Sequence, residues 1–171
     1  QEVVSVNEDA GTADLLVTLS APVDVDVLVD ADHQDDTATE TGATAADDDY
    51  DTVDETLTYS NVSGSTRQFT VTVPIGIDNI VELDEAMQVV LSNLAASGRD
   101  VTIGNGSGDV NILNDDSAVV QIDDVVINEE AGSATLTLTL SAPVDTQTDV
   151  NWQTLDGTAT AAFNDYIVDG A

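Results

Sequence analysis

The sequence predicts an all-β protein: an immunoglobulin-like antiparallel β-sandwich of about seven strands, arranged in tandem units. Three observations support this prediction, namely apolar residues that alternate with a period of two, turn residues at regular spacing, and a long internal repeat. A period of two is typical of strands with one buried face. No segment shows a convincing amphipathic-helix pattern. About seven strands in roughly 115 residues match the size of an immunoglobulin-like sandwich.

The clearest strand patterns lie over residues 23–29 and 69–75, where mostly valine occupies every second position. In the first of these, Asp24 and Asp26 fall on the alternate positions, as expected for a solvated strand face. Clusters of Gly, Asn, Asp and Ser separate the apolar segments and predict turns. Further strands are expected at residues 3–6, 13–20, 56–60, 87–91 and 108–113.

The chain repeats itself at an offset of 121 residues. Residues 6–24 and residues 127–145 are identical at 13 of 19 positions, which is far beyond chance. A shorter match at an offset of 116 sets residues 44–50 against residues 160–166. We therefore expect two units: residues 1–116 form a complete sandwich, and residues 117–171 form the first half of a second.

The second unit has no counterpart of residues 57–116 and so lacks about half of the strands. A half-sandwich would expose a large apolar area and unpaired strand edges. We expect the chain to be part of a longer array of such units. Completion of the second unit by another chain is the next alternative, and a half-unit that is stable alone is the least favoured.

Composition excludes several classes of function. The chain has 34 acidic residues and only two basic ones, Arg67 and Arg99, for a net charge of −32. Such a charge is incompatible with binding to nucleic acid or to an anionic membrane face. No apolar run approaches the roughly 18 residues of a membrane span, so no direct membrane insertion is expected.

Catalysis and soft-metal chemistry are also not expected. The chain has no cysteine and a single histidine, His33, which excludes disulfides, thiolate sites and multi-histidine zinc sites. His33 lies in a polar stretch that we expect to be an exposed loop. Serine and threonine nucleophiles lack a partner base, and few aromatic residues are present to bind a sugar.

Acidic residues gather in four connections between the expected strands. Alternate connections of a sandwich meet at one end, where carboxylates repel one another unless cations lie between them. Hard oxygen ligands in flexible loops, about six to eight per ion, are what Ca²⁺ requires. The pattern therefore indicates calcium, with an acidic surface that serves solubility alone as the alternative. The clusters are Glu8 and Asp9; Asp47, Asp48 and Asp49; Asp78, Glu82, Asp84 and Glu85; and Asp115 and Asp116.

At these residues the sequence resembles the Calx-β family. The matching motifs in the first unit are the opening at residues 7–11, the pair at 49–50, the run at 78–85, and the closing triplet at 114–116. In the second unit the stretch from Gly157 to Tyr166 is closer still to the family pattern. Each motif is weak alone, but their order and spacing, found twice, make a strong signal.

This resemblance implies a seven-stranded sandwich that binds several Ca²⁺ ions at the loops of one end, near the boundary with the next domain. Asn79 stands where the family often has a second Asp, which leaves the number of ions open. The second unit supplies only part of a site. Carried over by position, the implied ligands are Glu8, Asp49, Asp78, Glu82, Glu85, Asp115 and Asp116, with Glu129 and Asp165 in the second unit.

From these observations we expect a calcium-binding structural or adhesive spacer of an extracellular or cell-surface protein, rigidified by Ca²⁺ between domains. The expected partners are neighbouring Calx-β-like units or identical chains, and the adhesive target is left open. Two alternatives remain: a subunit of a polymerised extracellular filament or sheath, and a calcium sensor that regulates a transporter. The excess of Asp also suits a high-salt environment, where cations screen self-repulsion.

Overall fold

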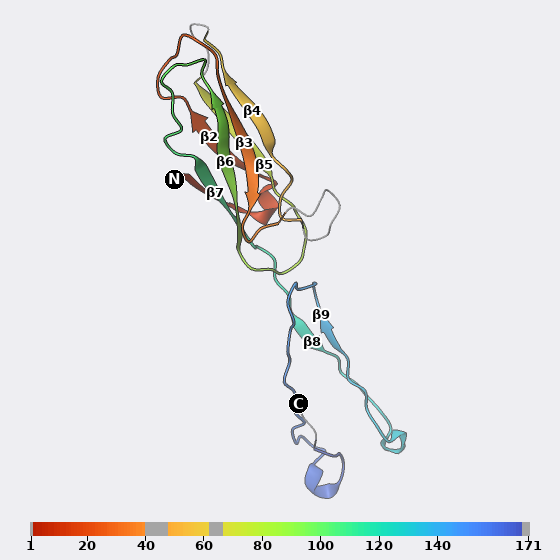
Figure 1. Ribbon diagram of the computed structural model, residues 1–171. Helices are drawn as coiled ribbons and strands as arrows, with labels where there is room; N and C mark the ends of the chain where they lie inside the picture. Colours follow the sequence, from red (N-terminus) through yellow and green to blue (C-terminus); the bar gives the residue numbers. More distant parts are fainter. Residues whose placement is uncertain (1, 40–47, 62–66, 169–171) are drawn as a thin grey trace.

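The computed structural model describes residues 2–39, 48–61 and 67–168, and the first unit forms a sandwich of two β-sheets (Figure 1). The repeat residues at 44–46 lie outside the described residues. In chain order, the strands of the first unit are β1 (Glu2–Asn7), β2 (Thr12–Thr18), β3 (Val27–Asp35), β4 (Asp54–Tyr59), β5 (Gln68–Pro74), β6 (Glu85–Ala95) and β7 (Ser107–Leu113).

The two sheets have unequal sizes. One contains five strands in the order β1-β7-β6-β3-β4, and the other contains β2 and β5. All pairings are antiparallel except that of β1 with β7, which is parallel. This pairing corrects the expectation that every strand is antiparallel. Its cause is the single 3₁₀ turn η1 (Glu8–Ala10), followed by Gly11 at a φ of 72°, which carries the chain from β1 in one sheet to β2 in the other.

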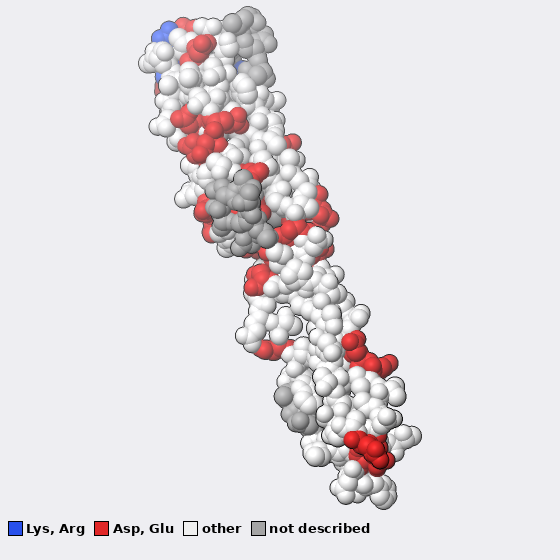
Figure 2. Space-filling model, turned by 90° about the vertical axis from the view of Figure 1, so that its right-hand side faces the viewer, with Lys and Arg blue, Asp and Glu red and all other residues white. Residues whose placement is uncertain are grey.

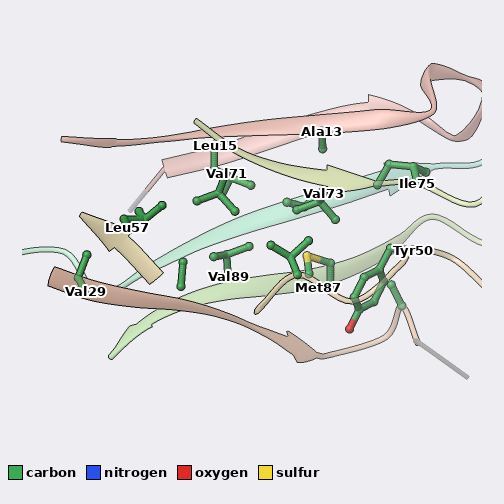
Figure 3. Packing of buried hydrophobic residues seen from close by; sticks show 14 of the residues in the cluster. Ala13, Leu15, Val29, Tyr50, Leu57, Val71, Val73, Ile75, Met87 and Val89 are labelled. Atoms are coloured by element: carbon green, nitrogen blue, oxygen red, sulfur yellow. The ribbon is translucent and has the colours of Figure 1, made fainter. Parts of the chain in front are cut away.

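The core consists of aliphatic side chains from both sheets (Figure 3). Val71 and Val73 of β5 are fully buried, and they face Met87 and Val89 of β6 across the sandwich (Figure 3). The alternation predicted over residues 69–75 is therefore the alternation between the core and solvent. Burial of these apolar surfaces contributes about 25 cal/mol per Å² to folding.

Strand β3 differs from its sequence prediction. It begins at Val27 and ends at Asp35, whereas the valine pattern predicted a strand over residues 23–29. The side chain of Asp24 instead binds Arg99, and that of Asp26 accepts a hydrogen bond from the backbone N–H of Asn61. These contacts hold residues before Val27 in loop geometry, while inward-facing Ala31 continues the strand where the valine pattern has stopped.

His33 lies within β3 and not in an exposed loop as expected. Its Nδ1 is 2.9 Å from Oδ1 of Asp54 on the neighbouring strand β4. Its ring also meets the ring of Tyr50 edge-to-face, with centroids 5.9 Å apart. His33 is thus a structural residue that ties β3 to β4.

The second unit contains a two-stranded antiparallel sheet of β8 (Val120–Ile122) and β9 (Leu138–Leu140). None of its described residues is buried, and most of its large apolar side chains are exposed. Trp152 lies two residues after Val150, an alternation that predicts a core position, yet its side chain is 41 % exposed.

The helices among the described residues are single 3₁₀ turns: η1, η2 (Glu129–Ala131) and η3 (Ala161–Phe163). In the described part of the chain no helix has the length and apolar character needed to cross a bilayer.

The tightest glycine contact in the sandwich is at Gly76, and it yields a stability prediction. A Cβ at this position would lie 1.8 Å from the backbone oxygen of Asp48, so Gly76→Ala must displace the backbone. We expect this substitution to lower the free energy of unfolding by about 1–3 kcal/mol, the usual cost of overpacking. Denaturant unfolding measures the change.

Gly104→Ala is the matched control, because a Cβ there meets nothing within 4 Å. We expect it to change the free energy of unfolding by no more than about 0.5 kcal/mol. Equal stability of the two variants would contradict the close approach of Gly76 to Asp48.

Candidate metal centre

Acidic residues from separate loops meet at the end of the sandwich where β1 and β7 stop. Because these strands run parallel in register, Asn7 lies beside Leu113, and the residues that follow each strand are brought together. Strand β6 begins at the same level, since Glu85 pairs with Ile112. The connection from β5 to β6, which carries Asp78 and Glu82, therefore reaches the same place.

Three carboxylates form the centre of this cluster. Glu8, Asp78 and Asp116 each present an oxygen within 4.8 Å of the oxygens of the other two. Glu8 is only 7 % exposed, whereas Asp78 and Asp116 are half-buried. Burial, followed by the charges of Asp78, Glu82 and Asp116, raises the pKa of Glu8 to about 7. Burial and the charges of Asp115, Asp9 and Asp78 likewise raise the pKa of Asp116.

A second group adjoins the first. Glu8, Asp49, Glu82, Glu85 and Asn114 line a small common hollow. Burial raises the pKa of Glu85 to about 8, helped by a hydrogen bond to Asp49 and by the charges of Asp49, Glu82 and Asp145. Its Oε2 is buried and has no hydrogen-bond partner among the described residues. An unpaired buried carboxylate oxygen is costly unless a proton or a cation satisfies it.

Hydrogen bonds to the backbone fix the loops that carry these acids. Oδ1 of Asp78 accepts the N–H of Ile80 at 2.6 Å, and Oδ1 of Asn114 accepts the N–H of Glu82 at 3.1 Å. Oδ2 of Asp49 accepts the N–H of Thr39 at 2.6 Å. Each bond uses one carbonyl or carboxylate oxygen and leaves further lone pairs for another ligand. The loops are therefore pre-arranged around the acidic centre.

The remaining predicted site residues lie at the margin of this cluster or in the second unit. Asp115 is exposed beside Asp116, close enough for its charge to raise the pKa of that neighbour. Glu129 is exposed at the start of η2 in the second unit. Oδ2 of Asp165 accepts the N–H of Thr160 at 2.9 Å. Within the described residues, the second unit contains no group of three acids comparable to that of the first.

The structure adds Asp145, which sequence reasoning missed. This residue belongs to the second unit, yet its charge acts on Glu85 of the first. Its N–H donates to the oxygen of Val81 at 3.3 Å, and the N–H of Val81 donates to the oxygen of Pro143 at 3.0 Å. The repeat counterpart of Asp145 is Asp24, which binds Arg99, so no local pattern marked Asp145 as a site residue.

No basic side chain compensates the cluster. Arg99 binds Asp24, and Nη1 of Arg67 donates to the oxygen of Ser20. Acidic groups spread along the visible face in Figure 2, whereas basic groups appear only near one end. The donors at the centre are all hard oxygens, which suit Ca²⁺ or Mg²⁺ and not the metals that prefer nitrogen or sulfur ligands. Carboxylates so close together are stable in the charged form only with a cation between them.

The fold and the site together define a β-sandwich with a cluster of carboxylates at one end, in a chain whose sequence repeats in a second unit. The model of the Calx-beta domain family matches residues 1–117 and again residues 114–169, so the chain belongs to this family. Calx-beta domains are calcium-binding modules. The resemblance stated from the sequence is thereby confirmed. No curated protein sequence matches the chain.

Solved structures confirm the predicted fold class. The calcium binding domain CBD12 of CALX1.1 matches with a TM-score of 0.55 at 20 % identity, over 67 % of this chain and 42 % of the other. The apo-form Calx CBD1 domain matches with a TM-score of 0.54 at 21 % identity, over 67 % of this chain and 91 % of the other. The Calx CBD2 domain matches at 18 % identity with a TM-score of 0.52, covering 65 % and 81 %. The chain thus spans less than half of CBD12, and at these identities the likeness concerns the fold.

The raised pKa values predict a specific pH dependence of stability in a chelator. Unfolded glutamates lose their protons near pH 4–5, whereas folded Glu8 and Glu85 hold theirs up to about pH 7 and 8. Between these values the folded state binds more protons than the unfolded state, so the free energy of unfolding falls as the pH rises. We expect the Tm to fall by roughly 5 °C or more between pH 5 and pH 8.5, as measured by calorimetry.

The double variant Glu8→Gln, Glu85→Gln is the control, because its neutral amides do not titrate. Its Tm should change much less over the same pH range. A wild-type profile as flat as that of the variant would show that the two carboxyls are not buried together as described.

Proposed function

We propose that the chain is a calcium-binding module whose ion site lies at the end of the first sandwich. The observation that carries this proposal is the approach of three carboxylates, one of them almost fully buried, with no basic side chain among them. Family membership and the calcium-binding domains among the solved neighbours support the choice of Ca²⁺. Glu8, Asp78 and Asp116 would hold one ion, and Asp49, Glu82 and Glu85 would extend the site.

When bound, Ca²⁺ supplies the positive charge that the protein lacks at this point. The protein's own contribution is to hold the carboxylates ready. Glu8 is held by the turn after β1, Asp78 by its bond to Ile80, and Asp116 by the end of β7. Because the loops are fixed beforehand, little ordering entropy is lost when the ion binds.

The finer proposal is that calcium stiffens the junction between successive units. Asp116 is followed directly by the second unit, and the backbone bonds of Val81 to Pro143 and Asp145 cross the junction beside Glu85. Without a cation, the charge that Glu85 gains when it loses its proton repels that of Asp145 and weakens these bonds. With a cation, the same acids attract a common ion. This supports a role as a structural or adhesive spacer of a secreted or cell-surface protein.

A calcium sensor that regulates a transporter is the second candidate. It is favoured by the calcium-binding domains of Calx among the solved neighbours. The two roles use the same site but differ in affinity, because a sensor responds to micromolar Ca²⁺ and an extracellular module to roughly 0.1–1 mM. A titration therefore separates them. A polymerised filament or sheath would instead show calcium-dependent light scattering.

Calcium binding predicts a rise in Tm that depends on the cluster. An occupied site adds about 2.7 kcal/mol at 100 times its dissociation constant, which corresponds to several °C in Tm. We expect Asp116→Asn to weaken calcium affinity by about tenfold or more, since it removes one central charge. Calorimetry in chelator and in stepwise Ca²⁺ measures both quantities.

Asp100→Asn is the matched control, because it removes the same charge from an exposed site beyond the other end of β6. It should leave calcium affinity unchanged. If NaCl of equal ionic strength raised the Tm as much as Ca²⁺, the acids would form a salt-adapted surface and the proposed site would be wrong.

Stiffening predicts a narrower distance distribution between the units when calcium is present. The chain has no cysteine, so Thr102→Cys and Thr158→Cys introduce two unique spin-label positions, one in each unit. Double electron–electron resonance should give a broad distribution of distances between the two labels in chelator and a narrow one in Ca²⁺. If the distribution in Ca²⁺ were as broad as in chelator, although calcium binding had been measured, the spacer role would be contradicted and the sensor role would remain.

A further inference from the structure

The loop that leads from β3 to β4 is closed by two side-chain contacts. The hydroxyl of Tyr50 donates a hydrogen bond to Oδ1 of Asp35, the last residue of β3, and we term this bond the tyrosine clasp. The second contact joins Thr39 and Asp49 in both directions. The N–H of Thr39 donates to Oδ2 of Asp49 at 2.6 Å, and the N–H of Asp49 donates to the backbone oxygen of Thr39 at 3.3 Å.

The second unit repeats both contacts with the counterpart residues. The hydroxyl of Tyr166 donates to Oδ1 of Asp156 at 2.6 Å. The N–H of Thr160 donates to Oδ2 of Asp165 at 2.9 Å, and the N–H of Asp165 donates to the backbone oxygen of Thr160 at 3.2 Å. The two loops are therefore closed at their base in the same way.

This agreement is informative because the loops differ in length. Residues 35–39 read DDTAT and residues 156–160 read DGTAT, so four of five positions are identical. Between the threonine that ends this stretch and the acid that it binds, the first unit has five more residues than the second. The contacts at the base are the same in spite of this difference. The place of the acid is therefore set by these contacts and not by the number of residues in the loop.

The tyrosine clasp also forms without a surrounding core. Tyr50 is only 1 % exposed, and Figure 3 shows its hydroxyl directed away from Ile75 and the other labelled core residues. In the second unit no described residue is buried, yet Tyr166 makes the same bond to Asp156. The bond is thus a local feature of the loop, and the core of the first unit encloses the ring that carries it.

In the first unit the closed loop holds Asp49 beside Glu85. The two residues line the same small hollow, and a hydrogen bond joins their carboxyl groups. Tyr50 forms an isolated antiparallel bridge with Ile75, and the N–H of Gly76 donates to the backbone oxygen of Asp49 at 3.0 Å. The backbone of Asp49 is therefore held from the end of β5 on one side and by the tyrosine clasp on the other.

We propose that Tyr50 and Asp35 are positioning residues of the calcium site, because their bond holds Asp49 where it shares a cation with Glu85. This inference rests on the proposed calcium-binding function and deepens it. Neither of the two residues is assigned a contact with the ion. A carboxylate that is held in place loses little entropy when it binds, whereas one that is released must be ordered first. Loss of the clasp should therefore weaken calcium binding.

The test is Tyr50→Phe in the full chain, which removes the hydroxyl and keeps the buried ring. We expect the dissociation constant for Ca²⁺ to rise about 3- to 10-fold, the range that one lost hydrogen bond produces. Isothermal titration calorimetry measures it at a temperature where both chains are folded. In NMR hydrogen exchange in chelator, the amides of Thr39 and Asp49 should exchange faster than in the wild type.

Tyr166→Phe is the matched control, because it breaks the same bond in the second unit, away from the acidic centre of the first. It should leave calcium affinity unchanged and speed exchange only at Thr160 and Asp165. A second pair of variants separates the hydrogen bond from the charge. Asp35→Asn keeps an acceptor oxygen for the hydroxyl and should stay within about twofold of the wild-type affinity. Asp35→Ala removes the acceptor from an exposed position and should match Tyr50→Phe.

A Tyr50→Phe chain that melts at a lower temperature but binds Ca²⁺ with wild-type affinity would overturn the proposal, because the clasp would then act on stability alone. Equal losses of affinity in Asp35→Asn and Asp35→Ala would assign the effect to the charge of Asp35 and would overturn it as well. Both results leave the calcium-binding function intact. A wild-type chain that binds no Ca²⁺ would instead overturn the proposed function, and this inference with it.

Discussion

Repulsion among carboxylates at one end of the sandwich is the constraint on which the rest of the structure depends. The parallel pairing of β1 with β7 brings Glu8 next to Asp116, and the start of β6 adds Glu85. No arginine lies among them to balance the charge. The core therefore stabilises the folded state in any buffer. The acidic end stabilises it only when protons or cations are bound. The environment, and not the sequence alone, sets the net stability.

The part of the sandwich that drives folding and the part that responds to cations lie in different places. The aliphatic core, centred on residues such as Val73 and Met87, holds the strands in register without any ion. The acids occupy connections, whose backbone is fixed by short local hydrogen bonds. A change in ion occupancy therefore acts first on the charge balance at this end and on the junction with the second unit. This arrangement suits either a spacer or a sensor, because both need an ion to alter geometry at the boundary while the domain stays folded.

Much of the fold could be predicted because its signals are local. The alternation around Val71 fixes which face of β5 is buried, and the internal repeat fixes the number of units. The parallel partner of β1 could not be predicted, because strand pairing depends on how η1 crosses between the sheets. Loop acids such as Glu8 and Asp78 could be predicted as a group, because they lie in connections between strands and alternate connections of a sandwich meet at one end. Asp145 could not, because its proximity to Glu85 arises from contact between the units.

The parallel ladder between β1 and β7 also has a mechanical consequence. These strands carry the first and the last residues of the sandwich, and six successive residue pairs join them from Glu2 to Asn7. A pull on the two ends of the unit draws the strands past each other along their length, so all of the ladder's hydrogen bonds bear the load together. An antiparallel pairing of the same two strands would let the bonds break one at a time. The sandwich is thus built to resist tension along the chain, with the acidic loops placed where the ladder ends.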